Sequence, residues 1–346
     1  MYYANKIESL QDIFGTSSIE LLPDSIRVED SIYPIVDDVI ILLDAKQLPL
    51  ALQKKIGTKT ETLQEKPQDE FSQDIQYTFS EEWKSYPDIL PEHKSDFLRY
   101  FGEIDLTKLA NSRVCDLGCG IGRWSYFLHD SAREMVLMDF SEAIFVARNN
   151  LRKADNALFF MGDLLQLPFR DGFADFLFCL GVLHHLPVPC LQAVRDLKPL
   201  APRLLIYLYY SLDNRPLHFR IMLALATMLR NRLAQIKSTK SRSIFTAILT
   251  YGIYLPLILL GNILKPLGLS RFVPIYEGYT GRGVLRIKQD VYDRFFTGIE
   301  QRVSRKEIME LEDTFSKITV FEGIPYWHFL CERGGEQMQP EVLLDA

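Results

Sequence analysis

The chain has 346 residues, enough for one large domain with additions or for two domains. Its net charge of −6 argues against non-specific nucleic-acid binding over the whole surface, and 47% apolar residues are ordinary for a globular protein. The five cysteines show no C-x-x-C pair and no zinc spacing, so we expect buried thiols and no metal site. The first residues lack the apolar core of a signal peptide, which favours a cytoplasmic protein.

Residues 1–57 predict a small β-rich module. Apolar and polar side chains alternate over residues 25–35, which predicts two short strands joined by an Asp/Ser turn. Residues 37–43 continue as a buried strand. Residues 58–75 are polar and poor in large apolar side chains, which predicts a linker. A helix-rich lead-in to a catalytic domain over residues 76–333 follows, and residues 334–346 are expected to form a flexible tail.

Residues 114–124 are the most informative part of the sequence. An apolar strand containing Asp116 runs into a turn with glycine at 118, 120 and 122, and a helix follows. Such a turn holds a nucleotide-like ligand, because a Cβ would keep the backbone away from it. A dinucleotide fingerprint needs glycine at position 123, which is Arg123 here. A carboxylate at Asp116 suits a ligand that carries an ammonium group better than a pyrophosphate.

Further strands are predicted at residues 134–139, 157–161, 173–179 and 203–210. Candidate site residues lie at or after the carboxyl ends of the first three. The first ends at Asp139, which can bind two ribose hydroxyls, and the second is followed by Asp163. The third leads into Gly181 and the pair His184-His185. Residues 304–307 have capping-box spacing and open a helix, and residues 317–323 and 326–332 predict two closing strands.

The run D-L-G-C-G-I-G resembles motif I of class I S-adenosylmethionine (SAM)-dependent methyltransferases, of the type 11-like group, and the later segments resemble the family's other motifs in order. The resemblance implies an α/β fold, with a Rossmann-like sheet of seven strands, helices on both faces and an antiparallel last strand. It implies SAM as the cofactor and places Asp163 next to the adenine amino group. The implied cofactor-binding residues are Asp116, Gly118, Cys119, Gly120, Gly122, Asp139, Phe140, Asp163, Leu164, Leu180 and Gly181.

Two N-terminal segments also resemble parts of methyltransferases. Residues 33–43 are similar to a zinc-ribbon-like, Trm112-like module that precedes some catalytic domains, but no cysteine precedes position 115, so its metal site is absent. The F-x-x-E-W run at residues 79–83 is similar to a segment that closes over the SAM site. The alternative is a capped helix whose Trp83 and Tyr86 pack on the sheet.

A helical insertion is predicted over residues 212–276. Residues 214–276 contain no aspartate or glutamate, and residues 244–264 carry no charge at all. That uncharged run is long enough to span a bilayer, but Gly252, Pro256 and Gly261 interrupt it. The alternatives are a lid over an apolar substrate pocket, docking of residues 215–271 on a membrane surface, and a true span; the first two are compatible. Residues 214–276 carry nine cations: Arg215, Arg220, Arg230, Arg232, Lys237, Lys240, Arg242, Lys265 and Arg271.

The residues suggest roles in methyl transfer. Because the donor is already activated, the protein mainly has to align the acceptor and exclude water, and a base matters only for an acceptor with an acidic proton. His184 and His185 are the candidate catalytic residues, as base or substrate orienters; alternatively, one caps the next segment and the other packs against the lid. Tyr209, Arg294 and Arg302 are candidate contacts for the acceptor.

The leading hypothesis is a SAM-dependent methyltransferase for a small, lipophilic acceptor. We expect it in the cytoplasm, and association with a membrane is left open. A second hypothesis is an RNA- or protein-directed methyltransferase that grips its substrate through the basic insertion. The aliphatic character of the insertion argues against nucleic acid, since RNA sites interleave cations with exposed aromatic rings. A third is a non-catalytic partner with the SAM fold, which the presence of Asp116, Asp139 and Asp163 argues against.

Overall fold

The computed structural model describes residues 1–57 and 70–334; for Glu70, Phe71, Tyr77 and residues 81–85 it describes the backbone only. Residues 58–69 of the predicted linker (58–75), residues 335–346 of the predicted tail (334–346) and the side chain of Trp83 thus lie outside the described residues. The boundary predicted at residue 57 and the other domain limits remain predictions.

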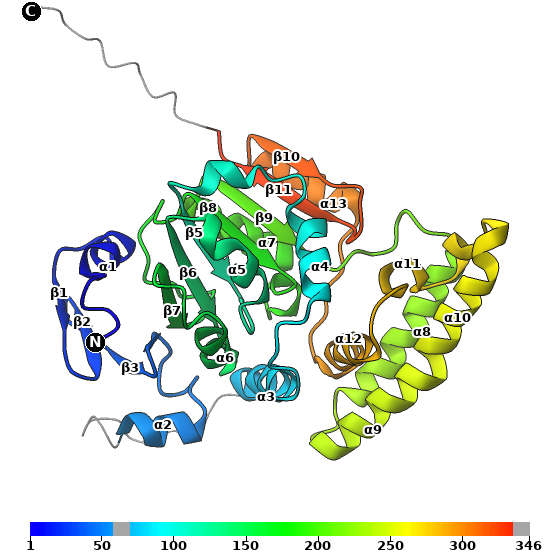
Figure 1. The fold of residues 1–346 in the computed structure, drawn as a ribbon, viewed down its shortest axis with the longest axis horizontal. Coiled ribbons are helices and arrows are strands. Elements are labelled where there is room, and N and C mark those ends of the chain that lie inside the picture. The colour runs from blue at the N-terminus through cyan, green and yellow to red at the C-terminus, as the bar shows by residue number, and fades with distance from the viewer. Residues whose placement is uncertain (58–69, 335–346) are drawn as a thin grey trace, which may run out of the picture.

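Seven strands form the centre of one sheet (Figure 1), in the order β7-β6-β5-β8-β9-β11-β10. The first five of these are mutually parallel, and β11 is antiparallel to both β9 and β10, as expected. All the strands predicted within this region are confirmed, although several are shorter than expected. Their bounds are β5 (Arg113–Leu117), β6 (Glu134–Asp139), β7 (Ala157–Met161), β8 (Phe176–Leu180), β9 (Arg203–Tyr207), β10 (Lys317–Val320) and β11 (His328–Glu332).

The predicted count of seven strands is wrong, because the sheet has eleven. The N-terminal strands β1 (Ile19–Leu21), β2 (Ser25–Val28), β3 (Ser31–Val36) and β4 (Val39–Ile41) extend it beyond β7. Strand β4 pairs in parallel with β7, so the backbone groups of β7 are bonded on both sides. The residues of the expected N-terminal module therefore continue the central sheet, and its likeness to a Trm112-like module remains a prediction.

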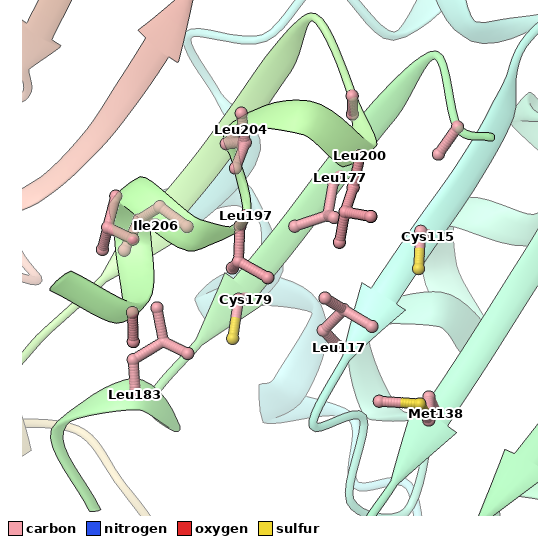
Figure 2. Packing of buried hydrophobic residues seen from close by; sticks show 14 of the residues in the cluster. Cys115, Leu117, Met138, Leu177, Cys179, Leu183, Leu197, Leu200, Leu204 and Ile206 are labelled. Carbon is pink, nitrogen blue, oxygen red and sulfur yellow. The ribbon is translucent and has the colours of Figure 1, made fainter. Parts of the chain in front are cut away.

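Apolar side chains fill both faces of the sheet, because successive residues of a strand point to opposite sides. Cys115 and Leu117 of β5 face one cluster, in which Leu183 and Leu197 cover the sheet (Figure 2), while Val114 faces the other. All five cysteines are free and buried, which confirms the expectation of buried thiols. Helices on the two faces include α5 (Arg123–Leu128), α6 (Ala143–Asn150), α7 (Cys190–Asp196) and α13 (Arg305–Met309).

The capping box at the start of α13 is present, since Ser304 and Glu307 bond to each other's backbone N–H groups. The N-terminal helices are α1 (Ile7–Phe14), α2 (Leu50–Gly57), α3 (Glu70–Ser85) and α4 (Glu92–Phe101). Residues 70–75, expected in the linker, belong to α3. Short 3-10 helices lie at Leu106–Leu109, His129–Ser131, Leu183–His185, Lys198–Leu200, Lys265–Leu267, Ser270–Phe272 and Glu310–Asp313.

The insertion is helical, as predicted. Helix α8 (Leu217–Leu233) is followed by α9 (Thr239–Leu249), a π-helical turn (Thr250–Tyr254) and α10 (Leu255–Leu264), and then by α11 (Tyr276–Tyr279) and α12 (Val284–Phe296). We call residues 217–267 the helical hairpin. Figure 1 shows it standing apart from the sheet, with α12 between the two, and α12 contacts both α8 and α9.

The hairpin rests on a small core of its own that includes Leu249, Tyr254, Val291 and Phe295. Its far end approaches α11 closely: a Cβ on Gly261 would lie 2.0 Å from the ring of Tyr276. Glycine at this position therefore serves packing and is not a sign that the helix breaks.

Candidate active site

The glycine turn after β5 has the backbone that the sequence predicts. Gly118 and Gly122 have φ values of 76° and 72°, in the left-handed region that side chains with a Cβ disfavour. A Cβ on Gly118 would also lie 2.3 Å from a methyl carbon of Val182. The turn is thus pressed against the segment after β8, and it places the first residues of α5 at the carboxyl edge of the sheet.

Asp116 is a buried acid near the end of β5. It is 1% exposed, and its carboxylate accepts a hydrogen bond from the Ser125 hydroxyl at 2.6 Å. Burial raises the pKa of Asp116 to about 7. Among the described side chains, no cation forms an ion pair with it, so this residue fits a ligand that brings a positive group.

The other two predicted acids follow the neighbouring strands. Asp139, at the end of β6, accepts hydrogen bonds from the Gly120 N–H at 2.8 Å and from the N–H and hydroxyl of Ser141 at 2.8 and 2.7 Å. Burial raises the pKa of Asp139. Asp163, after β7, accepts from the Leu165 N–H at 2.9 Å. The structure thus brings the three acids to one edge of the sheet.

Sequence reasoning missed two glutamines at this edge. The Gln47 side chain donates to the second oxygen of Asp163 at 2.8 Å. Gln76 of α3 donates to the carbonyl oxygens of Gln47 and Phe140, at 2.9 and 2.8 Å. Helix α3 therefore covers the end of β6 where the family resemblance puts the cofactor. No local pattern marks either glutamine, since the contacts join segments far apart in sequence.

The remaining predicted cofactor residues lie around the same edge. Cys119 is buried within the turn, and burial raises the pKa of its thiol well above the ordinary value. Leu164 packs against the core, and Leu180 and Gly181 line a cavity at the end of β8. The roles of these residues in holding a cofactor remain predictions.

That cavity has a volume of about 510 Å³ and lies between the sheet and the helical hairpin. Strands β8 and β9 end at it, α4, α5 and α12 form its walls, and α8 and α10 close it on the far side. The three predicted acceptor contacts, Tyr209, Arg294 and Arg302, all line it. The hairpin contributes an apolar wall that includes Met222, Leu223, Ala226, Leu229 and Leu257.

Polar contacts fix the predicted acceptor residues. The Tyr209 hydroxyl donates to Asp293 at 2.9 Å, and burial raises the pKa of Tyr209 well above the ordinary value. Arg302 pairs with Glu300 at 2.8 Å and donates to the Tyr210 carbonyl at 3.0 Å. Asp293 itself lines the cavity and was not singled out from the sequence.

The two histidines lie behind Tyr209. His184 is 0% exposed, its ring stacks on Tyr209 with centroids 3.9 Å apart, and burial lowers its pKa well below the ordinary value. The Nδ1 atom of His185 is 2.7 Å from the carbonyl oxygen of Ile299. His184 therefore packs on one of the predicted acceptor contacts, but neither histidine is among the residues that line the cavity. Their catalytic role remains a prediction.

No cluster of three or more His, Cys, Asp or Glu side chains suited to a metal ion occurs among residues 1–57 and 70–334.

The comparisons with known proteins identify the central part of the chain. Residues 114–199, from β5 to the segment after α7, match a family model described as a methyltransferase domain. This segment is similar to methyltransferase domains, and the match supports an enzyme that uses SAM. No curated protein gives a significant match to the chain.

Solved structures with similarity to the chain share parts of it. They include a Pyrococcus horikoshii protein at 25% identity (TM-score 0.32, 38% of this chain and 66% of that one) and a Bacillus subtilis protein at 23% (TM-score 0.31, 37% and 57%). A magnesium protoporphyrin IX methyltransferase from Synechocystis, solved with SAM, has 22% identity (TM-score 0.30, 49% and 78%). The chain spans less than two thirds of the first two.

Proposed function

We propose that the whole chain is a SAM-dependent methyltransferase whose acceptor is a small, lipophilic molecule. The observation that carries this proposal is the cavity, which connects the predicted cofactor edge at Gly181 with the apolar wall of the hairpin. Its volume lies within the range of about 300–1,000 Å³ typical of small-molecule sites.

The residues at the sheet edge divide the work. Asp116 supplies the negative charge for the ammonium group of the donor, Asp139 holds its ribose and Asp163 its adenine. When bound, SAM supplies a methyl group on a sulfonium, which transfers by in-line displacement. The cavity walls align the acceptor and exclude water. For an acceptor with an acidic proton, Asp293 is a carboxylate on the cavity wall that can receive the proton.

We further propose that the hairpin docks on an anionic membrane surface. The helix Thr239–Leu267 is long and apolar enough to cross a membrane, yet only 28% of its most apolar window is buried. Exposed cations without acidic neighbours in sequence flank the apolar side chains, which complements anionic lipid headgroups. The exposed apolar residues of the hairpin are Leu217, Ile221, Met222, Leu225, Met228, Leu229, Ile244, Phe245, Ile248, Tyr251, Ile253, Leu259, Leu260, Ile263 and Leu267.

Surface docking suits this hairpin better than a span. One side of the α9–α10 helix packs on α12 through Leu249 and Tyr254, so only its other side is free to meet lipid. An apolar acceptor dissolved in the membrane then reaches the cavity through the hairpin without crossing water.

One experiment tests both parts. The protein is incubated with methyl-labelled SAM and vesicles that contain a cellular lipid extract, with or without anionic phospholipid, and then floated through a density gradient. We expect protein and labelled product in the vesicle fraction, and more of both with anionic lipid. The triple variant Ile244→Asp/Ile248→Asp/Ile263→Asp should reduce flotation and labelling at least tenfold, because burying each isoleucine in lipid is worth about 1.5–3 kcal/mol.

The matched control replaces three exposed apolar residues outside the hairpin, as Ile32→Asp/Leu50→Asp/Leu98→Asp, and should float like the unaltered protein. Equal flotation of the two triple variants would contradict membrane docking. Label in the aqueous fraction, or in added RNA, would contradict a lipophilic acceptor.

A further inference from the structure

Arg294 differs from the other arginines around the cavity. It lies on α12, and its Nη1 atom donates a hydrogen bond to the Tyr254 hydroxyl at 3.3 Å. Its Nε atom is buried without an acceptor. Among the described residues, no carboxylate forms an ion pair with it. The guanidinium nevertheless lines the cavity.

Three other arginines that line the cavity form ion pairs within the protein. Arg282 forms two hydrogen bonds with Asp96, at 2.7 and 2.9 Å, and Arg302 pairs with Glu300. Arg215, just before α8, forms an ion pair with Glu277 of α11.

The acids nearest to Arg294 in sequence are already engaged. Asp290 pairs with Arg286, and Asp293 accepts hydrogen bonds from Tyr209 at 2.9 Å and from the Thr297 hydroxyl at 3.3 Å. Asp290 and Glu300 act on Arg294 electrostatically from a distance, but neither forms an ion pair with its guanidinium.

This charge restricts what can fill the cavity. Arginine keeps its proton in proteins, so the guanidinium cannot become neutral. While the cavity holds water, the water solvates the charge. An acceptor that displaces this water leaves a buried, unpaired cation, which is strongly unfavourable unless the acceptor brings a negative group. A carboxylate or phosphate meets a guanidinium in a bidentate, charge-assisted geometry.

We infer that the acceptor is an amphipathic anion, with a carboxylate or phosphate group bound by Arg294 and an aliphatic part along the hairpin. The inference rests on the proposed function and narrows its substrate class. Tyr209 and Arg302 flank the anionic end, and Met222, Leu223 and Leu257 form the wall for the aliphatic end. The same division accounts for the apolar hairpin and the arginine-rich walls within one cavity.

Binding of simple probes to the full chain, with SAM present, tests this assignment. The probes are decanoate, decyl phosphate and decan-1-ol, measured by titration calorimetry. We expect both anions to bind at least tenfold more tightly than the alcohol. Arg294→Gln should lower the affinity for both anions at least tenfold and change the affinity for the alcohol by less than twofold. Arg294→Lys should retain part of the affinity for the anions. Whichever of decanoate and decyl phosphate binds more tightly identifies the acid group that the site prefers.

Arg271→Gln is the control variant. Arg271 also lines the cavity, but it is exposed and lies against the ring of Phe272. Its loss should therefore change the affinity for each probe by less than twofold. Equal binding of alcohol and anions, or equal weakening of all three probes by Arg294→Gln, would overturn the inference. A SAM titration of the same samples separates the two proposals. Intact SAM binding without anion preference refutes only this inference, while absent SAM binding refutes the proposed function.

Discussion

Replacing Gly118 by alanine is expected to weaken SAM binding at least a hundredfold. The residue has a φ of 76°, and the added Cβ would lie 2.3 Å from a side-chain carbon of Val182. The left-handed backbone alone costs an alanine about 1–2 kcal/mol. The turn would have to move away from Val182, which shifts the loop N–H groups and Asp116 relative to the ligand. Calorimetric titration with SAM and urea unfolding measure the two effects.

Two variants separate the causes. Gly118→Ala combined with Val182→Ala relieves the contact but not the backbone strain, so we expect a partial recovery of affinity. Gly252→Ala in the hairpin is the matched control, because a Cβ there meets no atom within 4 Å, and its SAM affinity should stay unchanged. An alanine at position 118 that binds SAM within threefold of the original affinity would refute the role assigned to this turn.

SAM affinity is expected to rise with pH up to about 7 and to fall above about 8. Burial raises the pKa of Asp116 to about 7, and the ammonium group of the donor needs the ionised carboxylate. Each pH unit below this pKa therefore costs up to about tenfold in affinity. The fall at high pH follows from the α-amino group of SAM, whose ordinary pKa is about 7.7–8.0.

The same shift has a consequence for the free protein. Because the folded-state pKa of Asp116 lies above the value of 3.8 for an unperturbed aspartate, the folded state binds the proton more tightly. The contribution of this residue to stability is thus fully present below about pH 3.8 and is lost as the pH rises through about 7. In Asp116→Asn the rise of SAM affinity between pH 5.5 and 7 should disappear, whereas the fall above pH 8 should remain. A rise that persists in this variant would assign the titration to another group.

The sequence predicted the features whose causes are local. Continuous apolar runs predict β5, β6 and β7, and the glycines predict the turn between β5 and α5, because these signals act over a few residues. The capping box at Ser304 and the helical character of the insertion follow from similarly short patterns. The fold of the methyltransferase region was therefore predictable to within a few residues.

Long-range pairing was not predictable in the same way. The residues of β4 show a short apolar run that suits a separate module as well as it suits a strand beside β7, and only the structure selects the second arrangement. The contact between Gln47 and Asp163 likewise joins distant segments. The position of His184 behind Tyr209 depends on how a short 3-10 helix is rotated, which no pattern in one sequence records.

Ion pairing of the cations in and around the insertion could not be predicted from the sequence either. The sequence of the insertion reveals many cations and no acids, but not which cations are neutralised by other parts of the chain. Arg282 and Asp96 are far apart in sequence and form a bidentate pair, whereas Arg294 lies next to Asp293 and forms none. The distinction that defines the anionic end of the cavity therefore came from the structure.

The central claim is that the turn after β5, with Asp116 and Asp139, holds SAM. Titration calorimetry of SAM into the full chain and into Asp116→Ala and Asp139→Ala, at pH 7.5, tests it most directly. We expect one SAM per chain, with at least a tenfold loss of affinity in each variant, because each loses a buried or hydrogen-bonded carboxylate of the site. Unchanged SAM affinity in Asp116→Ala would contradict the account.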